Sequence, residues 1–353
     1  MTKRRVLVLC GGISTEHGVS VVSAKGVISS LDRNRNEVIT VGITRTGAWR
    51  RLDLLDDLGS GSDGLPVVTE DDGEAVRLIR GPDGPTLETP SGSVPIDVVF
   101  PVLHGTGGED GAIQGFLETI GVAYVGSGVA ACALGMAKHL AKPVLEASGV
   151  EVTPWTTATV HQVRNDLQAV VDGVLGRFQL PVFVKPSEQG SSVGVHKARD
   201  SAELAKAIED AVSYDGTALI EEAIEGREVE VSVLGNEAPM ASVVGEIIPC
   251  NDFYDFEAKY LAEGSELIIP AQLPDGVAER IQGMAVRAYL ALGCEGLARV
   301  DFFVQSERIL CNEINTMPGF TPISMYPKLW EASGLAYPDL LERLIELALE
   351  RHG

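Results

Sequence analysis

The chain has 353 residues, a formal net charge of -22, and 45% hydrophobic but only 5% aromatic residues. This length predicts two or three domains, and the composition is typical of α/β proteins whose cores consist of Val, Leu, Ile and Ala. The acidic balance argues against nonspecific binding to nucleic acid or to anionic membranes, because such binding depends on clustered Lys and Arg.

Cysteine usage and the first residues bear on location. Five cysteines are scattered without C-x-x-C spacing or nearby histidines: Cys10, Cys132, Cys250, Cys294 and Cys311. This favours free thiols in a reducing compartment over a disulfide framework or a zinc site, so we expect a cytoplasmic protein. The basic start imitates a signal peptide, but its apolar run is too short, and no run approaches membrane-spanning length.

The first segment opens as a strand followed by a helix. Residues 6–10 are a continuous apolar run, which predicts a buried strand that breaks at Gly11 and Gly12. The polar cluster at 14–16 can then cap a helix that runs to about Leu31.

Further elements continue this pattern. The sequence predicts strands at 38–43 and 96–103 and a helix near 113–120. Together they indicate an α/β sheet whose ligand side lies at the carboxyl ends of its strands, where Glu16 and His104 both fall. Residues 52–95 are acidic and rich in Gly, Pro and Asp, which predicts an excursion of hairpins or loops.

The second segment carries lysines and a loop suited to phosphate. A helical pattern containing Lys138 precedes strands at 182–185 and 219–222, and Lys185 ends the first of these strands. The loop 187–194 is rich in serine and glycine, so its N–H groups and hydroxyls can surround phosphates. It is not a Walker loop, because G-x-x-x-x-G-K-[ST] is absent and a strand follows it. A plain hairpin turn is the alternative.

An acidic linker joins the second and third segments. Residues 218–224 form a strand that leaves into it, and Glu228 follows just beyond Gly226. A planar base could lie against this backbone while the carboxylates accept hydrogen bonds from it. A solvated acidic linker would have the same sequence. The third segment then predicts strands at 229–234 and 242–249, a helix at 277–292, a hairpin and an amphipathic packing helix from Pro338.

That hairpin carries candidate metal ligands. Two β-rich runs, 299–303 and 310–315, are joined by a short turn, so Asp301, Glu313 and Asn315 can converge at one end of a sheet. Glu313 and Asn315 are two residues apart and share a face of their strand. Oxygen ligands of this kind suit Mg²⁺, and a carboxylate between two ions could help to clamp a triphosphate. Polar strand-end residues that cap turns are the alternative.

The order of these features resembles that of the ATP-grasp ligases: phosphate lysines, a glycine-rich loop, a linker for adenine, then metal ligands. Among these, the chain is similar over nearly its whole length to the D-alanine–D-alanine ligase family. The motifs that carry the resemblance are LCGGISTEHGVS at 9–20, LHGTGGEDGAIQG at 103–115, VKPSEQGSSVGV at 184–195, YDFEAKY at 254–260, RVDFF at 299–303 and NEINTMPGFTPISMYP at 312–327.

The resemblance implies an ATP-grasp fold of three domains, α/β overall and α+β in its ATP-binding part, with a mostly parallel sheet in the N-terminal domain. We expect a substrate domain at 1–126, a central ATP-grasp domain at 127–220 and a C-terminal ATP-grasp and metal-binding domain at 221–353. The implied activity joins two D-alanines through a D-alanyl phosphate, with release of ADP and phosphate, for peptidoglycan precursor synthesis. The implied partners are ATP, D-alanine, two Mg²⁺ ions, with Mn²⁺ as an alternative, and a second copy of the chain in a homodimer.

The resemblance also implies roles for individual residues. For ATP it assigns the phosphates to Lys138, Lys185, Ser191 and Ser192, the adenine edge to Glu221 and Ile224, and the ribose to Glu228, with Glu222 also among the ATP-binding residues. The metal ligands it implies are Asp301, Glu313 and Asn315. For the substrates it assigns the ammonium of the first D-alanine to Glu16, which is hydrogen-bonded through Ser191 to Tyr260, with His104 nearby. It assigns the transferred phosphoryl group to Lys259 and the oxyanion to Arg299 and the Gly319 amide. The carboxylate of the second D-alanine is assigned to Ser324 with Met325. The segment 249–270, which holds Lys259 and Tyr260, is expected to be a lid that is mobile without ligand.

Departures and competing hypotheses remain. Ala223 is small where several family members carry an aromatic residue, and Glu222 stands where a lysine often occurs, so the purine contacts are less well defined than the phosphate contacts.

The pair Lys259 and Tyr260 favours the dipeptide ligase over a D-lactate ligase, whereas no residue excludes D-serine. Another ATP-grasp enzyme should lack the positions of Glu16 and Ser324. A non-catalytic nucleotide-binding module should have lost a metal ligand or a phosphate lysine.

Overall fold

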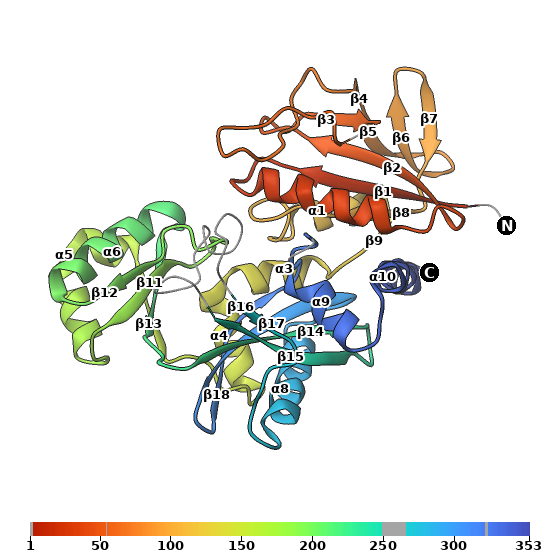
Figure 1. The fold of residues 1–353 in the computed structure, drawn as a ribbon. Helices are drawn as coiled ribbons and strands as arrows, with labels where there is room; N and C mark the ends of the chain where they lie inside the picture. The colour runs from red at the N-terminus through yellow and green to blue at the C-terminus, as the bar shows by residue number, and fades with distance from the viewer. Residues whose placement is uncertain (1–2, 54, 249–265, 322–323) are drawn as a thin grey trace.

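The computed structural model describes residues 3–53, 55–248, 266–321 and 324–353. Within them, the strands form three larger sheets and one small meander (Figure 1). The larger sheets follow one another along the chain and come from residues 4–124, 155–222 and 227–315. The α/β organisation expected from the sequence is therefore confirmed, while the three domain boundaries given above stay a prediction.

The first sheet has six strands in the order β4-β3-β2-β1-β8-β9, and its four strands from β2 to β9 are parallel. They are β1 (Arg4–Gly11), β2 (Asn36–Ile43), β3 (Trp49–Leu52), β4 (Glu74–Ala75), β8 (Val98–Pro101) and β9 (Ala123–Tyr124). Alternate β1 residues pack on opposite faces: Val6 and Val8 share a core with helix α1 (His17–Ser30), and Leu7 shares one with α2 (Ala112–Ile120). The continuous apolar run thus belongs to a strand that is buried on both sides.

The excursion between β3 and β8 folds as hairpins, as predicted. Strands β5 (Arg77–Gly81), β6 (Gly84–Thr89) and β7 (Gly92–Pro95) form an antiparallel meander. Leu78 and Leu87 from this meander are buried in the core that also contains α2. The excursion therefore covers part of the first sheet.

The second sheet is antiparallel, with the order β10-β13-β11-β12. Its strands are β10 (Trp155–Thr159), β11 (Val182–Pro186), β12 (His196–Ala198) and β13 (Thr217–Glu222), and helices α5 (Val160–Leu175) and α6 (Ser201–Asp215) pack against it. The sequence analysis missed both helices. Their start signals are present in the chain, since Thr159 and Gln162 form a capping box and the Asp200 side chain accepts hydrogen bonds from two N–H groups of α6.

The third sheet is also antiparallel, with the order β16-β15-β14-β17-β18. Its elements are β14 (Arg227–Leu234), β15 (Met240–Ile248), β16 (Glu266–Ile268), α8 (Val277–Ala291), β17 (Leu297–Gln305), β18 (Arg308–Asn315) and α9 (Met325–Ala332). The helix expected around Lys138 is in fact two helices, α3 (Val129–Met136) and α4 (Lys138–Ala147), which are separated at Ala137. Both pack into the core of this third sheet.

The last helix, α10 (Tyr337–His352), returns to the first sheet (Figure 1). Its Leu340, Leu344 and Ile345 are buried in the same core as Val6 and Val8. The buried carboxylate of Glu342 also contacts Arg4 and Asn36. The first and last parts of the chain therefore share one core. None of the helices described has the length and apolar character that crossing a bilayer requires.

Candidate active site

A cavity of about 1280 Å³ lies among the three sheets. Every predicted site residue that the structure describes lines it: Glu16, His104, Lys138, Lys185, Ser191, Ser192, Glu221, Glu222, Ile224, Glu228, Arg299, Asp301, Glu313, Asn315, Gly319, Ser324 and Met325. The remaining two, Lys259 and Tyr260, lie outside the described residues, as does most of the expected lid. Side chains that are far apart in the sequence are thus brought to one space.

The floor of the cavity is the hairpin of β17 and β18. Asp301 pairs with Glu313 in the ladder, and Arg299 pairs with Asn315, so all four side chains project from one face. Asn315 Nδ2 donates to Asp301 Oδ2 at 3.0 Å. The ladder shifts register between Asp301 and Phe302, so Asn312 is an extra residue on β18 and lines the same cavity. Bulges of this kind often occur beside active sites, where they redirect a side chain.

The donor set on this face fits a hard divalent cation. Two carboxylates and one amide provide oxygen atoms within one small area, which is the ligand chemistry that Mg²⁺ prefers. Among residues 3–53, 55–248, 266–321 and 324–353, no three His, Cys, Asp or Glu side chains form a metal-binding group. An ion held here would therefore use the amide of Asn315 together with Asp301 and Glu313, and would need further oxygen ligands from water or a bound phosphate.

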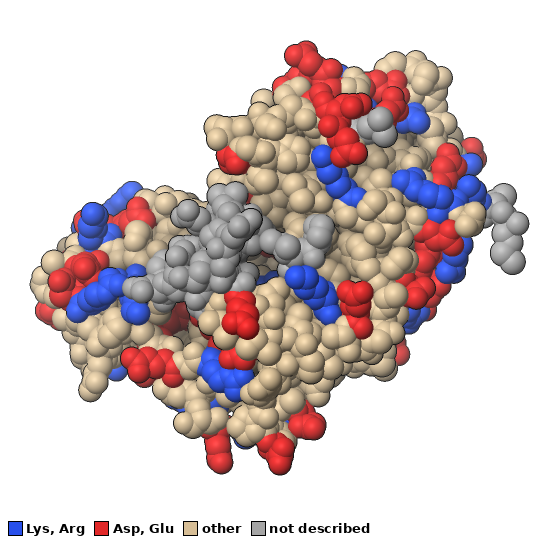
Figure 2. Space-filling model, viewed as in Figure 1, with Lys and Arg blue, Asp and Glu red and all other residues tan. Residues whose placement is uncertain are grey.

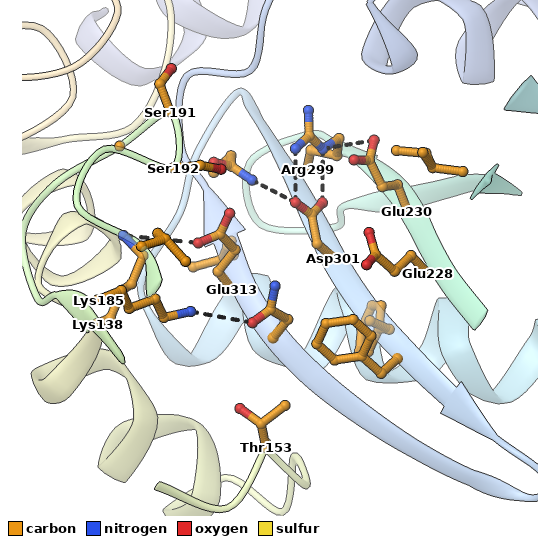
Figure 3. Close-up of a pocket in the computed structure, with 18 of the residues that line it drawn as sticks. Lys138, Thr153, Lys185, Ser191, Ser192, Glu228, Glu230, Arg299, Asp301 and Glu313 are labelled. Atoms are coloured by element: carbon orange, nitrogen blue, oxygen red, sulfur yellow. Dashed lines mark hydrogen bonds and ion pairs between the residues drawn. The ribbon is translucent and has the colours of Figure 1, made fainter. Parts of the chain in front are cut away.

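Arg299 is held between two acidic side chains. Its Nε and Nη2 donate to the two Asp301 oxygens at 2.8 Å each, and Nε lies 2.9 Å from a Glu230 oxygen (Figure 3). Burial alone would lower the pKa of Arg299, but the carboxylates of Asp301 and Glu230 outweigh it and raise the pKa well above its usual value. The guanidinium therefore stays charged beside the oxygen donors. The sequence analysis missed Glu230, although it lies two residues from Glu228 on the same strand.

Two lysines face the hairpin from the opposite wall (Figure 3). Lys138 is the first residue of α4, and its Nζ lies 2.8 Å from Gln189 O and 3.9 Å from Glu313. Burial lowers the pKa of Lys138, and the ammonium of Lys185 lowers it further, against the opposing effect of Glu313. Burial would also lower the pKa of Lys185, but Glu221 and Glu313 outweigh it and raise the pKa. Both ammonium groups are thus directed at the space above the hairpin.

Glu221 has partners that the sequence analysis did not foresee. Its carboxylate lies 2.5 Å from Lys142 Nζ and 2.6 Å from Lys185 Nζ, and it accepts a hydrogen bond from Thr153 Oγ1 at 2.5 Å. Burial alone would raise the pKa of Glu221, but the two ammonium groups hold it well below its usual range. In this structure the carboxylate predicted to meet adenine is therefore engaged by lysines. A second lysine one helical turn after Lys138 was a signal available in the sequence.

The serine-rich loop reaches from the second sheet to the first. Ser191 and Ser192 have φ values of 49° and 57°, in the left-handed region, which turns the loop sharply. The Ser191 hydroxyl donates to the Glu16 carboxylate. Glu16 is the N-cap residue of α1, but it makes no capping hydrogen bond with its side chain. The polar cluster expected to cap α1 thus supplies a carboxylate to the cavity.

His104 and Ser324, which were predicted to lie near the substrates, also line the cavity. His104 Nε2 lies 3.2 Å from Ser23 Oγ, and Nδ1 lies 3.4 Å from Glu109. Burial alone would lower the pKa of His104, but Glu109 and the nearby Glu16 outweigh it and raise the pKa. At the start of α9, the Ser324 hydroxyl lies 2.7 Å from Thr321 Oγ1 and accepts from the Thr321 amide at 3.0 Å. The Glu16 carboxylate therefore lies near the His104 ring and accepts from the Ser191 hydroxyl.

The surface outside the cavity has a different character. On the face shown in Figure 2, Lys and Arg side chains are interspersed with Asp and Glu and form no continuous basic area. The net charge of -22 agrees with this mixture. The positive charge directed into the cavity is thus local, and it comes from basic residues of its lining, among them Lys138, Lys185 and Arg299.

Comparison with known proteins gives consistent matches along the chain. The family model "D-ala D-ala ligase N-terminus" matches residues 5–127, and "D-ala D-ala ligase C-terminus" matches residues 144–346. The chain is 48% identical to the D-alanine–D-alanine ligase of Acetivibrio thermocellus, over 99% of this chain and 97% of that protein. Among solved structures, the D-alanine-D-alanine ligase from Coxiella burnetii has a TM-score of 0.87 and 40% identity, and covers 100% of this chain and 95% of its own. The VanG D-Ala:D-Ser ligase from Enterococcus faecalis has a TM-score of 0.84 and 34% identity, over 98% of this chain and 100% of its own.

Proposed function

The chain belongs to the D-alanine–D-alanine ligase family, and on that premise we propose that it joins two D-alanines into D-alanyl-D-alanine for peptidoglycan precursor synthesis, converting ATP to ADP and phosphate. The observation that carries this proposal is the single cavity lined by all 17 predicted site residues that the structure describes. Phosphate lysines, oxygen ligands and a carboxylate suited to an ammonium group are all next to one another there. A non-catalytic module would have lost some of these groups.

The first step activates a carboxylate, which is a poor electrophile. Lys138 and Lys185 bind the ATP phosphates, with Ser191 and Ser192 on the loop above them, while Glu16 holds the ammonium of the first D-alanine. Mg²⁺, held by Asp301, Glu313 and Asn315, supplies neutralisation of phosphate charge when it is bound. The carboxylate of the amino acid then attacks the terminal phosphorus, and the products are D-alanyl phosphate and ADP.

The second step forms the peptide bond. Ser324, with Met325 beside it, orients the carboxylate of the second D-alanine so that its amine attacks the acyl carbon. The oxyanion that develops meets Arg299, which stays protonated beside Asp301, and the amide of Gly319. Aimed donors of this type contribute about 3 kcal/mol each to transition-state stabilisation. The ammonium of the second D-alanine gives up a proton before its nitrogen attacks, and collapse of the tetrahedral species then breaks the bond to phosphate and releases inorganic phosphate.

Assembly and location belong to the same proposal. We infer a homodimer, as the family resemblance implies, and a cytoplasmic location. Four of the five cysteines lie in the described residues, and all four are buried and free: Cys10, Cys132, Cys294 and Cys311. Buried free thiols suit a reducing compartment, where ATP is also available.

One assay tests the proposed reaction. The protein is mixed with ATP, Mg²⁺ and D-alanine, alone or with D-serine or D-lactate, and phosphate release and product mass are followed together. We expect stoichiometric phosphate and D-alanyl-D-alanine from D-alanine alone. Phosphate release without a dipeptide would contradict the proposal, and a mixed product formed in preference to the dipeptide would reassign the second substrate.

A further inference from the structure

Lys142 is a buried lysine that does not line the cavity. Its side chain is 2% exposed, and its Nζ contacts Glu221 at 2.5 Å and Thr153 Oγ1 at 2.6 Å. The cavity wall includes both of these partners and Lys185, but not Lys142 itself. Any effect of Lys142 on a bound nucleotide must therefore pass through a neighbour.

Helix α4 places Lys138 and Lys142 one turn apart on the same face. The ammonium of Lys138 faces the cavity and Glu313, whereas that of Lys142 faces Glu221. Glu221 thus lies between two cations, with Lys185 on its other side at 2.6 Å. Helix α4 thus places the Lys138 ammonium at the cavity and the Lys142 ammonium beside Glu221.

The charges of Lys142 and Glu221 determine how strongly Lys185 attracts a phosphate. A buried Lys185 paired with Glu221 alone would form a neutral pair, and the attraction between that pair and a phosphate would be weak. With Lys142 present, Glu221 keeps a cationic partner when the Lys185 ammonium turns toward a phosphate. A buried carboxylate also needs full compensation, because an unpaired charge in the interior is strongly unfavourable. Lys142 supplies that compensation from the side away from the ligand.

We propose that Lys142 is a positioning residue for phosphate binding: by pairing with Glu221, it leaves the positive charge of Lys185 available to the ATP phosphates. The proposal rests on the function proposed above, because it assumes that Lys185 meets a nucleotide phosphate. It differs from a packing role for Lys142 in one respect. If charge compensation is the cause, the need for Lys142 disappears when Glu221 is neutral.

A double-mutant cycle between Lys142 and Glu221 tests this difference. The variants are K142M, K142R, E221Q and K142M/E221Q, and the measurement is ADP affinity by isothermal titration, with adenosine as the ligand that lacks phosphate. We expect K142M to weaken ADP binding about tenfold and adenosine binding little, the size of one lost charge-assisted contact. K142R keeps the charge and should restore most of the affinity. In the E221Q background, K142M should change ADP affinity by less than about twofold.

Other outcomes overturn the proposal. Equal tenfold losses from K142M in both backgrounds, or equal losses for ADP and adenosine, indicate that Lys142 only packs α4. Where K142M alone fails to fold, K142M/E221Q is compared with E221Q, since that pair leaves no uncompensated carboxylate.

Wild-type protein that binds ADP but makes no dipeptide would remove the proposed reaction and leave this proposal standing. Wild-type protein that binds no ADP would remove both.

Discussion

Asp301 on β17 lies directly opposite Glu313 on β18, and both carboxylates project into the cavity beside Lys138. Each belongs to a different strand of one antiparallel pair, so the spacing between them is fixed by the ladder and not by a flexible loop. A cation bound between them would be held by two paired strands of the third sheet.

The first prediction concerns Glu313. E313Q keeps the size of the side chain but removes its charge, so dipeptide formation should fall at least about 100-fold. The far-UV circular dichroism spectrum and Tm should stay close to those of the wild type. E307Q, at the exposed turn of the same hairpin, is the matched control and should keep full activity. Near-normal turnover by E313Q would remove Glu313 from the metal-binding set.

The second prediction concerns the contact between Ser191 and Glu16. S191A removes the hydroxyl that donates to this carboxylate, so Glu16 loses a charge-assisted hydrogen bond. We expect kcat/KM for D-alanine to fall about tenfold, because such bonds contribute about 1.5 to 3 kcal/mol. Steady-state kinetics with D-alanine varied at saturating ATP measures this change. An unaltered KM and kcat for D-alanine would show that the contact does not orient Glu16 for binding.

The third prediction concerns pH and His17. The buried ring accepts a hydrogen bond from the Val68 amide at Nε2 and lies 2.7 Å from Gly12 O at Nδ1, which defines a neutral ring with its proton on Nδ1. Burial lowers the pKa of His17 below the 6.5 of the unfolded chain. The stability that neutral His17 contributes is therefore present above pH 6.5 and is lost as pH falls through the folded pKa, at up to about 1.4 kcal/mol per pH unit.

Urea denaturation of wild type and H17Q between pH 7.5 and 5.5 checks this sign. The stability difference between the two proteins should shrink as pH falls, because glutamine does not titrate. His104 has a raised pKa and its contribution is lost as pH rises, so only the difference between the two proteins isolates His17. A difference that stayed constant or grew toward pH 5.5 would contradict the assignment of a neutral ring.

The fourth prediction concerns Arg351 near the end of α10. Its guanidinium lies 4.2 Å from the centre of the Tyr124 ring and also contacts Gly126 O and Glu295. R351A should lower the free energy of unfolding by about 1 to 2 kcal/mol, because a cation–π contact and a hydrogen bond are lost together. R343A on the same helix removes only surface ion pairs and should cost less than about 0.5 kcal/mol. A large loss of ligase activity in R351A without loss of stability would point to a different role.

The sequence predicted those features of the site that depend on local pattern. Glu313 and Asn315 share a face because strand side chains alternate, and Lys185 was placed correctly because it ends a strand before a turn-rich loop. The bulge at Asn312 was not predictable, because a ladder shift depends on the partner strand. The pairing of Lys142 with Glu221 joins a helix to a strand 79 positions later, and no periodicity within either element indicates it.

The packing of α10 shows the same limit at the scale of the fold. Its amphipathic pattern correctly predicted a packing helix but could not say which core it enters. The helix lies against β8 and β9 of the first sheet, more than 200 residues earlier in the chain. Contacts of such sequence separation are determined by the whole fold.

The position of α10 has a consequence for synthesis in the cell. Domains at the start of a chain generally fold while the ribosome is still translating the rest. Here the apolar face of the first sheet stays incompletely covered until residues 340–348 have left the exit tunnel, because those residues complete its core. The nascent first sheet therefore reaches full stability only after α10 has been synthesised and has left the tunnel, and a ribosome that stalled before residue 337 would hold an unfinished sheet for chaperones to shield.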